Sequence, residues 1–456
     1  RVGKREVRPP ACCRVRVPVL LALLLLSGCV QVQRPADPAP PAASGLPALE
    51  FLPPVRLSCR AEDPINQAQD AAFRANCGAF GEPVIEVAGD GTVWASATCC
   101  VGRSPPIWVS RDAGRSFHLL PFADRTGLVR DAFGIEGDFA MDDAGNVFFF
   151  DISAASTYFS KYRADGTHVF TKADAFPPLV DRPWVRAGKA DEVWVFYNTG
   201  FATNLYHSTD GGLTWSVTPT GFDCGLMVFG QGPARDRLFA AGCPGLPRLW
   251  ASTDGGASFG QPIQLPVPAN PPLTALRNGT GTDPFMPPVS DAVGNVYVPF
   301  TYATNRDGTT QGVFVDVVRP DGSVVGPFEV SAPGTWNEKP WGAAGDAGKF
   351  VLAWYGTNQT KAQAKDAVWD LVVAATVDGA SAAPTFRTGR PDPEHVLKGD
   401  FGRQLGDFLQ ADVGPDGRAY VIYAHRGADN VLDNRVAITD GLALGKGIPA
   451  NGPVAR

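Results

Sequence analysis

The chain has 456 residues, of which 44% are hydrophobic and 19% charged, and its formal net charge is −6. With 51 glycines and 41 prolines and almost no helical periodicity, it has the composition of a turn-rich, strand-rich protein with enough apolar residues for a large core. The acidic balance, and the lack of a basic stripe interleaved with aromatic residues, exclude a surface that follows nucleic-acid phosphates.

Residues 1–28 are predicted to be a signal peptide. Arg14 and Arg16 precede the apolar run Val17–Leu26, which is too short for a comfortable membrane span and has the proportions of a signal-peptide core. The run ends in Leu26-Ser-Gly-Cys29, which resembles the lipobox of bacterial lipoproteins. That resemblance implies that Cys29 is lipidated and becomes the mature N-terminus. An ordinary secretory signal with an incidental cysteine is the alternative.

Residues 29–48 are predicted to be a disordered tether. The segment Pro35–Ser44 is rich in Pro and Ala and cannot bury a core. We therefore expect an exported lipoprotein, held on the outer side of the cytoplasmic membrane or at the cell surface. Its folded domain is predicted over residues 49–446, and residues 447–456 form a C-terminal tail.

Cysteine usage also favours export. Apart from Cys12, Cys13 and Cys29, six cysteines remain: Cys59, Cys77, Cys99, Cys100, Cys224 and Cys243. An even number in an exported domain suggests disulfides. Cys224 and Cys243 bracket two strands and can pair with each other, whereas the other four cysteines allow three connectivities. No histidine has ligand spacing to a cysteine pair, so no metal centre is predicted.

A repeated unit covers the folded region. An acidic residue, a strand, a Gly-containing turn and a strongly apolar strand recur seven times, in Glu82–Ala97, Asp138–Asp151, Asp181–Tyr197, Asp223–Ala241, Asp283–Thr301, Glu338–Tyr355 and Asp407–Tyr423. Such spacing suits a unit of four short strands. The pattern predicts an all-β fold, a seven-bladed β-propeller of four-stranded antiparallel blades. One short helix, Pro64–Arg74, is expected to decorate the first blade.

Three turns within these repeats share the pattern Ser-x-Asp-x-Gly-x-Ser/Thr-aromatic: Ser110–Phe117, Ser208–Trp215 and Ser252–Phe259. The Asp side chain can accept hydrogen bonds from its own turn, and Gly supplies a positive φ. The residues for which we expect a structural role are Ser110, Asp112, Gly114, Ser208, Asp210, Gly212, Trp215, Ser252, Asp254 and Gly256. Weaker hairpin signals of the same kind follow the other repeats, at Ala164–Gly166, Pro320–Gly322, Val377–Gly379 and Thr439–Gly441.

The three turns resemble the Asp-boxes, or bacterial neuraminidase repeats, of the sialidase superfamily, which also occur in sortilin-type receptors and xyloglucanases. The resemblance implies a propeller with these turns at the blade periphery, and a six-bladed sialidase propeller is the alternative. Sialidases bind the substrate carboxylate with three arginines and use a tyrosine nucleophile with a glutamate partner. The usual entry arginine is absent here, because its place reads Gly81-Glu-Pro-Val84.

Candidate site residues lie at the ends of the inner strands. Asp181-Arg-Pro-Trp184 is echoed by Glu338-Lys-Pro-Trp341, where a base can hold an anion and a tryptophan can stack on a sugar ring. In the alternative, the tryptophans pack between blades and the charges form a solvated rim. The catalytic candidates are Asp181, Arg182, Glu338, Asp407, Tyr423 and Arg426. The ligand-binding candidates are Arg182, Trp184, Lys339, Trp341 and His425.

The acidic residues that begin the repeats suggest a second hypothesis. If Asp138, Asp181, Asp283, Glu338 and Asp407 share a register, closure of the ring gathers them at one end of the channel. There they could bind a hard cation such as calcium or supply a pair of glycosidase carboxyls. We favour the alternative, in which each caps its own strand through backbone hydrogen bonds, and we expect no cofactor.

The sequence thus predicts a monomeric propeller, anchored in the cell envelope, that recognises a glycan or an envelope protein at the mouth of its channel. The first alternative is an exo-sialidase or another glycoside hydrolase. The second is a non-catalytic assembly or structural lipoprotein. Membrane contact is expected through the N-terminal lipid alone, and no nucleic-acid partner is expected.

Overall fold

The computed structural model describes residues 47–57, 81–98, 105–120, 134–153, 156–173, 176, 181–198, 203–222, 226–230, 236–242, 246–268, 286–360, 365–402, 404–427 and 430–445. The chain divides into residues 1–39, which lie outside this set, and a unit from Pro40 to Arg456 that contains all of it. The predicted signal peptide, lipidated Cys29, Pro64–Arg74 helix and all nine cysteines fall outside the described residues. Within the described part of the chain, no helix is long and apolar enough to cross a membrane.

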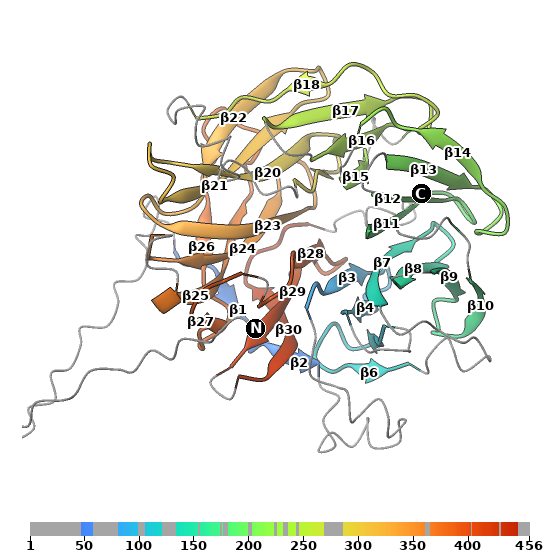
Figure 1. Ribbon diagram of the computed structural model, residues 1–456, viewed down its shortest axis with the longest axis horizontal. Coiled ribbons are helices and arrows are strands. Elements are labelled where there is room, and N and C mark those ends of the chain that lie inside the picture. Colours follow the sequence, from blue (N-terminus) through green and yellow to red (C-terminus); the bar gives the residue numbers. More distant parts are fainter. Residues whose placement is uncertain are drawn as a thin grey trace, which may run out of the picture. The chain divides into compact units, whose positions relative to one another are not determined.

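Four sheets are four-stranded antiparallel blades in which consecutive strands pair (Figure 1). The first contains β3 (Val84–Val87), β4 (Val93–Ser96), β5 (Ile107–Ser110) and β6 (His118–Leu119). The second contains β7 (Gly134–Met141), β8 (Val147–Ser153), β9 (Thr157–Tyr162) and β10 (His168–Ala173). The third contains β11 (Asp181–Ala187), β12 (Val193–Asn198), β13 (Thr203–Ser208) and β14 (Ser216–Pro219). The fourth contains β15 (Leu226–Phe229), β16 (Leu238–Ala241), β17 (Arg248–Ser252) and β18 (Ile263–Gln264).

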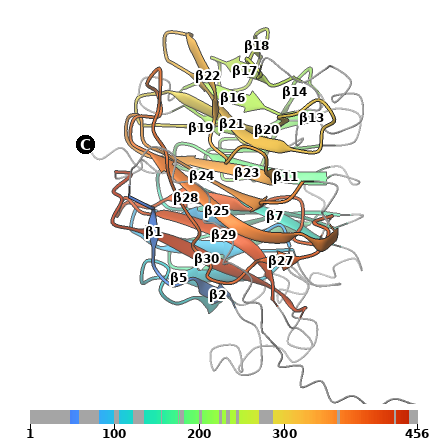
Figure 2. The ribbon, with the colours of Figure 1, turned by 90° about the vertical axis from the view of Figure 1, so that its left-hand side faces the viewer.

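A fifth blade joins the two ends of the folded unit. Its strand order is β28 (Gln410–Val413), β29 (Ala419–Arg426), β30 (Leu432–Asp440) and β1 (Glu50–Phe51), and Figure 2 views the molecule from the side on which these strands lie. The short strand β2 (Val55–Leu57) also pairs with β30. Because β1 comes from the start of the folded unit and β28 to β30 from its end, this blade fastens the ring closed.

The remaining nine strands form one continuous sheet. They are β19 (Val289–Ser290), β20 (Val296–Ala303), β21 (Gln311–Val318), β22 (Val324–Glu329), β23 (Trp336–Ala344), β24 (Phe350–Thr357), β25 (Val368–Thr376), β26 (Arg387–Gly389) and β27 (Leu397–Lys398). All pairings in this sheet are antiparallel except one, the parallel contact of Gln311 in β21 with Trp336 in β23.

The fold is therefore an all-β propeller, but the predicted number of blades is wrong. Beside the nine-stranded sheet, the described residues form five separate antiparallel blades of four strands, the fifth of them extended by β2, and neither seven nor the alternative six. The physical reason is the β21–β23 pairing, which merges two neighbouring repeats into one sheet. The sequence repeat shows how many hairpins the chain forms. Where a sheet ends depends on the hydrogen bonds between strands of neighbouring repeats, which the repeat does not show. Each repeated segment does form the antiparallel pair that its pattern predicts.

The first strands of the repeats enclose a channel. Strand β3 contacts β7, and contacts continue through β11, β15, β19, β23 and β28, which returns to β3. Side chains from one first strand satisfy edge N–H groups of the next. Asp138 accepts from the Val185 N–H (3.2 Å), and Asp412 accepts from the Val87 N–H (2.7 Å). These carboxylates therefore join neighbouring sheets, and burial raises their pKa values, that of Asp412 to about 7.

The three Ser-x-Asp-x-Gly turns connect the outer strands of their blades and share one set of hydrogen bonds. In the turn after β17, Ser252 Oγ donates to Asp254 Oδ1 (2.7 Å) and accepts from the Gly256 N–H (2.8 Å). Asp254 also accepts from the backbone and side chain of Ser258. Hydrogen bonds from Ser258 and Ser252 lower the pKa of Asp254 to about 2. The equivalent bonds recur at Asp112 and Asp210, so all three carboxylates are engaged within their own turns.

Candidate functional site

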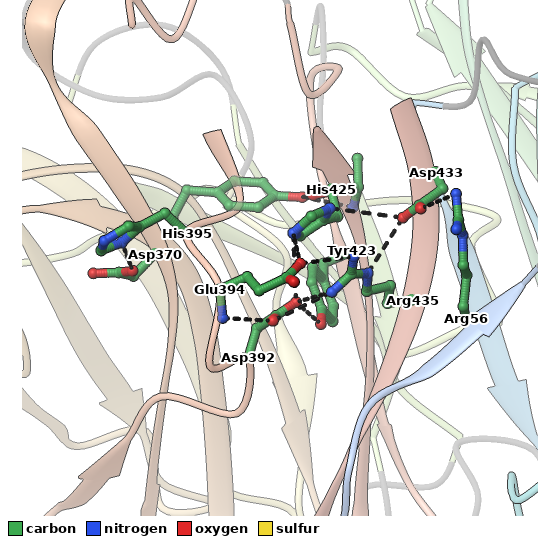
Figure 3. A network of polar contacts seen from close by, with 11 residues as sticks. Arg56, Asp370, Asp392, Glu394, His395, Tyr423, His425, Asp433 and Arg435 are labelled. Atoms are coloured by element: carbon green, nitrogen blue, oxygen red, sulfur yellow. Dashed lines mark hydrogen bonds and ion pairs between the residues drawn. The ribbon is translucent and has the colours of Figure 1, made fainter. Parts of the chain in front are cut away.

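Among the described residues, a group of charged side chains surrounds the segment Arg390-Pro-Asp-Pro-Glu-His395, which we call the acidic loop. It follows β26 and precedes β27, and it lies against the end of β29 and the start of β30 (Figure 3). Those strands contribute Tyr423, His425, Asp433 and Arg435. The site is thus built where the nine-stranded sheet meets the closing blade, and we call it the acidic loop site.

Asp392 is the buried centre of this site. Its Oδ2 accepts hydrogen bonds from the Tyr423 hydroxyl (2.6 Å) and from Nη1 of Arg435 (3.0 Å). Its Oδ1 accepts from the Glu394 N–H (3.0 Å), which fixes the loop backbone. Burial, and then the Asp392 charge, raise the pKa of Tyr423 well above its ordinary value. Tyr423 is therefore a hydroxyl donor that holds Asp392 in place.

Glu394 and His395 are the acidic loop residues whose ionisable side chains are most exposed. The Glu394 side chain is 64% exposed and pairs with Nη2 of Arg435 (3.2 Å). Nδ1 of His395 lies 2.7 Å from Asp370 Oδ1, and Arg390 binds the other oxygen of Asp370 (2.8 Å). A carboxylate that bonds Nδ1 orients an imidazole and leaves Nε2 for another partner.

His425 is fully buried beneath the acidic loop, and both of its ring nitrogens lack a hydrogen-bond partner among the described residues. Its Nε2 lies 3.4 Å from Glu394 Oε2 and 3.9 Å from Asp392 Oδ2, and its Nδ1 lies 3.8 Å from Asp433 Oδ1. Burial, and then the charge of Arg435, lower the pKa of His425, so the ring is neutral near pH 7.

Opposite charges balance most of the site. Arg435 binds Asp392, Glu394 and Asp433, and Arg56 of β2 also binds Asp433. Burial raises the pKa of Asp433, although the two arginines act against it. The result is a set of exposed donors and acceptors held by buried ion pairs, an arrangement that reduces the entropy lost when a ligand binds.

Of the predicted site residues, the structure brings Tyr423 and His425 into the acidic loop site. Arg426 instead contacts Asn430 and the Gln404 carbonyl at its edge. Asp181 and Arg182 belong to β11, and their side chains lie outside the described part of the structure.

Trp184 and Trp341 lie in the interior. They are only 2% and 5% exposed, and their rings are 5.6 Å apart. Phe408 packs against both of them. Trp184 belongs to β11 and Trp341 to β23, whereas Phe408 precedes β28. This matches the alternative in which the tryptophans pack between blades.

Three further candidates, Glu338, Lys339 and Asp407, lie in or next to the first strands of their repeats. Glu338 Oε1 accepts from Trp336 Nε1 (2.6 Å), and Lys339 has a positive φ of 57° at a β-bulge. The backbone N–H of Asp407 donates to Glu82 (3.1 Å). These contacts place Glu338 and Asp407 in strand entries, and neither residue joins the acidic loop site.

Asp138 occupies a different place, a channel cavity of about 80 Å³ that Arg186, Gln410 and Asp412 also line. Its carboxylate pairs with Arg186 (2.9 Å) and accepts from Gln410 (3.2 Å). The cavity is far smaller than the pockets of roughly 300–1,000 Å³ that hold small molecules, and it has room for a few waters. Asp283 lies outside the described residues.

Sequence reasoning missed Asp392, Glu394, His395, Asp370, Asp433 and Arg435. One signal was present, because the acidic loop puts four ionisable residues into six positions of a chain that is only 19% charged. The alternation of Asp433 and Arg435 in β30 also directs both side chains to one face. The partners of these residues come from separate strands, so spacing alone does not connect them.

No family model and no curated protein matches the chain. Solved structures align with it at low identity. One is the α-L-arabinofuranosidase Arb93A from Fusarium graminearum, 12% identical with a TM-score of 0.41, covering 85% of this chain and 97% of that one. Another is an ulvan lyase, 13% identical with a TM-score of 0.46, and the alignment covers 79% of this chain and 94% of the lyase. A third is the intramolecular trans-sialidase from Ruminococcus gnavus, 11% identical with a TM-score of 0.39, and the alignment covers 78% of this chain and 94% of the trans-sialidase. With every TM-score below 0.5, these similarities assign no activity to the chain.

Proposed function

We propose that the acidic loop site binds a glycan. The observation that supports this proposal is the combination of exposed donors and acceptors with buried supports: Arg390 and His395 are both held by Asp370. Sugar hydroxyls donate to carboxylates and accept from guanidinium and imidazole N–H groups, so both kinds of partner are present at one place. We further propose, as the sequence predicts, that the chain acts as a monomer outside the cytoplasmic membrane, held by a lipid on Cys29.

Binding of the full chain to a glycan array, followed by titration calorimetry with the best ligand, tests this proposal. We expect His395→Gln and Arg390→Gln each to weaken the affinity at least tenfold, because each removes a charged or oriented donor. His207→Gln is the matched control, since His207 also pairs with a carboxylate, Glu192 (3.2 Å), but lies in β13 of another blade. Equal affinities for all four proteins would remove the acidic loop site from consideration.

A glycoside hydrolase is the second candidate. The observation that favours it is the closeness of Asp392 and Glu394, which offer oxygens within 4.8 Å of each other. Carboxyl groups of retaining glycosidases are about 5–5.5 Å apart. In such an enzyme the exposed Glu394 would be the acid/base that meets the substrate, and Asp392, which Tyr423 and Arg435 hold in place, would be the second carboxylate.

Release of a fluorophore from a sialoside and from a panel of other aryl glycosides measures this activity. Turnover that Glu394→Gln abolishes and His207→Gln retains would establish the hydrolase. No turnover with any glycoside, together with glycan binding, would leave recognition as the function.

A further inference from the structure

The unpartnered imidazole of His425 calls for an explanation. Buried polar groups are almost always hydrogen-bonded, because an unpaired one loses its interaction with water without compensation. His425 is 0% exposed, and neither ring nitrogen has a hydrogen-bond partner in the described residues. Its Nε2 points toward the oxygens of the acidic loop (Figure 3). A neutral imidazole offers one N–H group and one nitrogen lone pair. The missing partner of the lone pair is therefore either a hydrogen-bond donor or a metal cation.

The distances around Nε2 suit a small cation. A tetrahedral ion about 2.0–2.2 Å from each ligand atom holds those atoms about 3.3–3.6 Å apart. Nε2 of His425 is 3.4 Å from Glu394 Oε2 and 3.9 Å from Asp392 Oδ2. Ligand atoms of these three residues all lie within 4.8 Å of one another. The distance to Glu394 falls within this range, and the distance to Asp392 is slightly longer.

The charge of the surroundings also favours a cation. Three carboxylates, Asp392, Glu394 and Asp433, face two guanidinium groups, those of Arg435 and Arg56. Among the described residues, one negative charge is therefore unbalanced. Arg435 binds the same carboxylates as the cation would, so it shares their charge and limits the affinity.

We propose that Asp392, Glu394 and His425 bind one zinc ion. The donor set selects the metal: imidazole nitrogen with carboxylate oxygen suits zinc, whereas calcium and magnesium prefer oxygen ligands alone. Three protein ligands leave a fourth position on the ion. The inference does not rest on the proposed glycan binding, which is tested at His395 and Arg390, although Glu394 is shared with the hydrolase candidate.

Equilibrium dialysis of the full chain against Zn²⁺, with metal content measured by mass spectrometry, tests this site. We expect one zinc per chain that Glu394→Gln and His425→Gln each weaken at least tenfold. Glu394→Gln is the safer variant for folding, because that side chain is 64% exposed. His395→Gln is the matched control, since it removes the neighbouring imidazole of the same loop and should retain the zinc.

Replacement by Co²⁺ identifies the ligands. We expect the visible absorption of tetrahedral Co²⁺ without thiolate-to-metal charge-transfer bands, and loss of this spectrum in Glu394→Gln and His425→Gln. The nine cysteines make the thiolate bands an informative alternative. Three outcomes would overturn the site: thiolate bands, zinc binding that is equal in wild type and both ligand variants, or no zinc retained by wild type.

Discussion

The repeated turns and the acidic loop site use the same kinds of side chain in opposite ways. In the turn after β17, Asp254 receives its hydrogen bonds from Ser252 and Ser258, within a few residues of itself. In the acidic loop site, Asp392 is bound by Tyr423 and Arg435 from two strands, and the neighbouring His425 has no hydrogen-bond partner among the residues that the structure describes. A carboxylate in the repeat serves its own backbone. In the acidic loop site, which lies outside the repeated pattern, polar groups are held by residues distant in the sequence. Some of their hydrogen-bond donors and acceptors stay available for a ligand.

This difference separates stability from function. Substitutions in the repeated framework should lower the free energy of unfolding, whereas substitutions of exposed groups in the acidic loop should change ligand binding with little effect on folding.

The largest effect is expected at the channel. Asp138→Ala leaves the Arg186 guanidinium and the Val185 N–H without their carboxylate in the interior. Removing one member of a buried ion pair costs about 3–5 kcal/mol. Urea unfolding of wild type and variant measures the loss. Lys349→Ala is the control, because its ion pair with Asp346 is partly exposed and should contribute under about 1 kcal/mol. Equal losses at both positions would contradict the structural role of Asp138.

Asp316 in β21 is a carboxylate of the repeated framework that has lost its water without gaining a described partner. It is fully buried, neither oxygen has a partner in the described residues, and burial raises its pKa to about 8. A folded pKa above the unfolded value of 3.8 means that the folded state binds the proton more tightly, so this contribution to stability is lost as pH rises from about 4 to 8.

Asp316→Asn removes this ionisation. Between pH 5 and 7, we expect the free energy of unfolding of wild type to fall by about 3 kcal/mol relative to the variant, since one pKa unit corresponds to about 1.4 kcal/mol. Urea titrations at pH 5, 6 and 7 measure the difference. A difference that does not change with pH would show that Asp316 has a partner or is hydrated.

Two adjacent glycines sharpen the comparison within one turn. Gly256 has a φ of +92°, and a Cβ at this position would meet Leu205 Cδ2. Gly255 has a φ of +68° but nothing within 4 Å of such a Cβ. Gly255→Ala should cost about 1 kcal/mol from backbone strain alone, and Gly256→Ala about 2–3 kcal/mol because the clash is added. Denaturant unfolding of both variants checks this order, and a larger loss at Gly255 would refute the packing argument.

The local structure of the framework was predictable from sequence because its causes are local. The pattern at Ser252–Phe259 predicted a turn in which Asp254 serves the backbone, and its hydrogen bonds show that turn. The number of blades was not predictable, because the pairing of Gln311 with Trp336 connects two repeats without any change in their pattern. The cysteine pairing stays a prediction.

The candidate site was predictable only in part. Tyr423 and His425 stood out because they end a strongly apolar strand in the last repeat, where polar residues break the pattern. Asp392 and Glu394 did not, because their partners lie about 30 to 40 residues further along the chain. Trp184 and Trp341 were plausible as a sugar platform until their burial was known. The sequence identifies the residues that depart from the repeat. Only the tertiary structure shows which of these residues contact each other.

The smallest effect on folding is expected at the most exposed residue of the acidic loop site. Glu394→Gln removes an ion pair with Arg435 in which the Glu394 side chain is 64% exposed. Exposed ion pairs contribute about 0–1 kcal/mol, so the unfolding midpoint in urea should change by an amount equivalent to under about 0.5 kcal/mol. Asp392→Asn is the matched comparison, because the same loop then loses charge at its buried centre and should be clearly less stable. If Glu394→Gln destabilises the protein as much as Asp392→Asn does, Glu394 belongs to the framework, and the division between repeated scaffold and acidic loop site fails at its most exposed carboxylate.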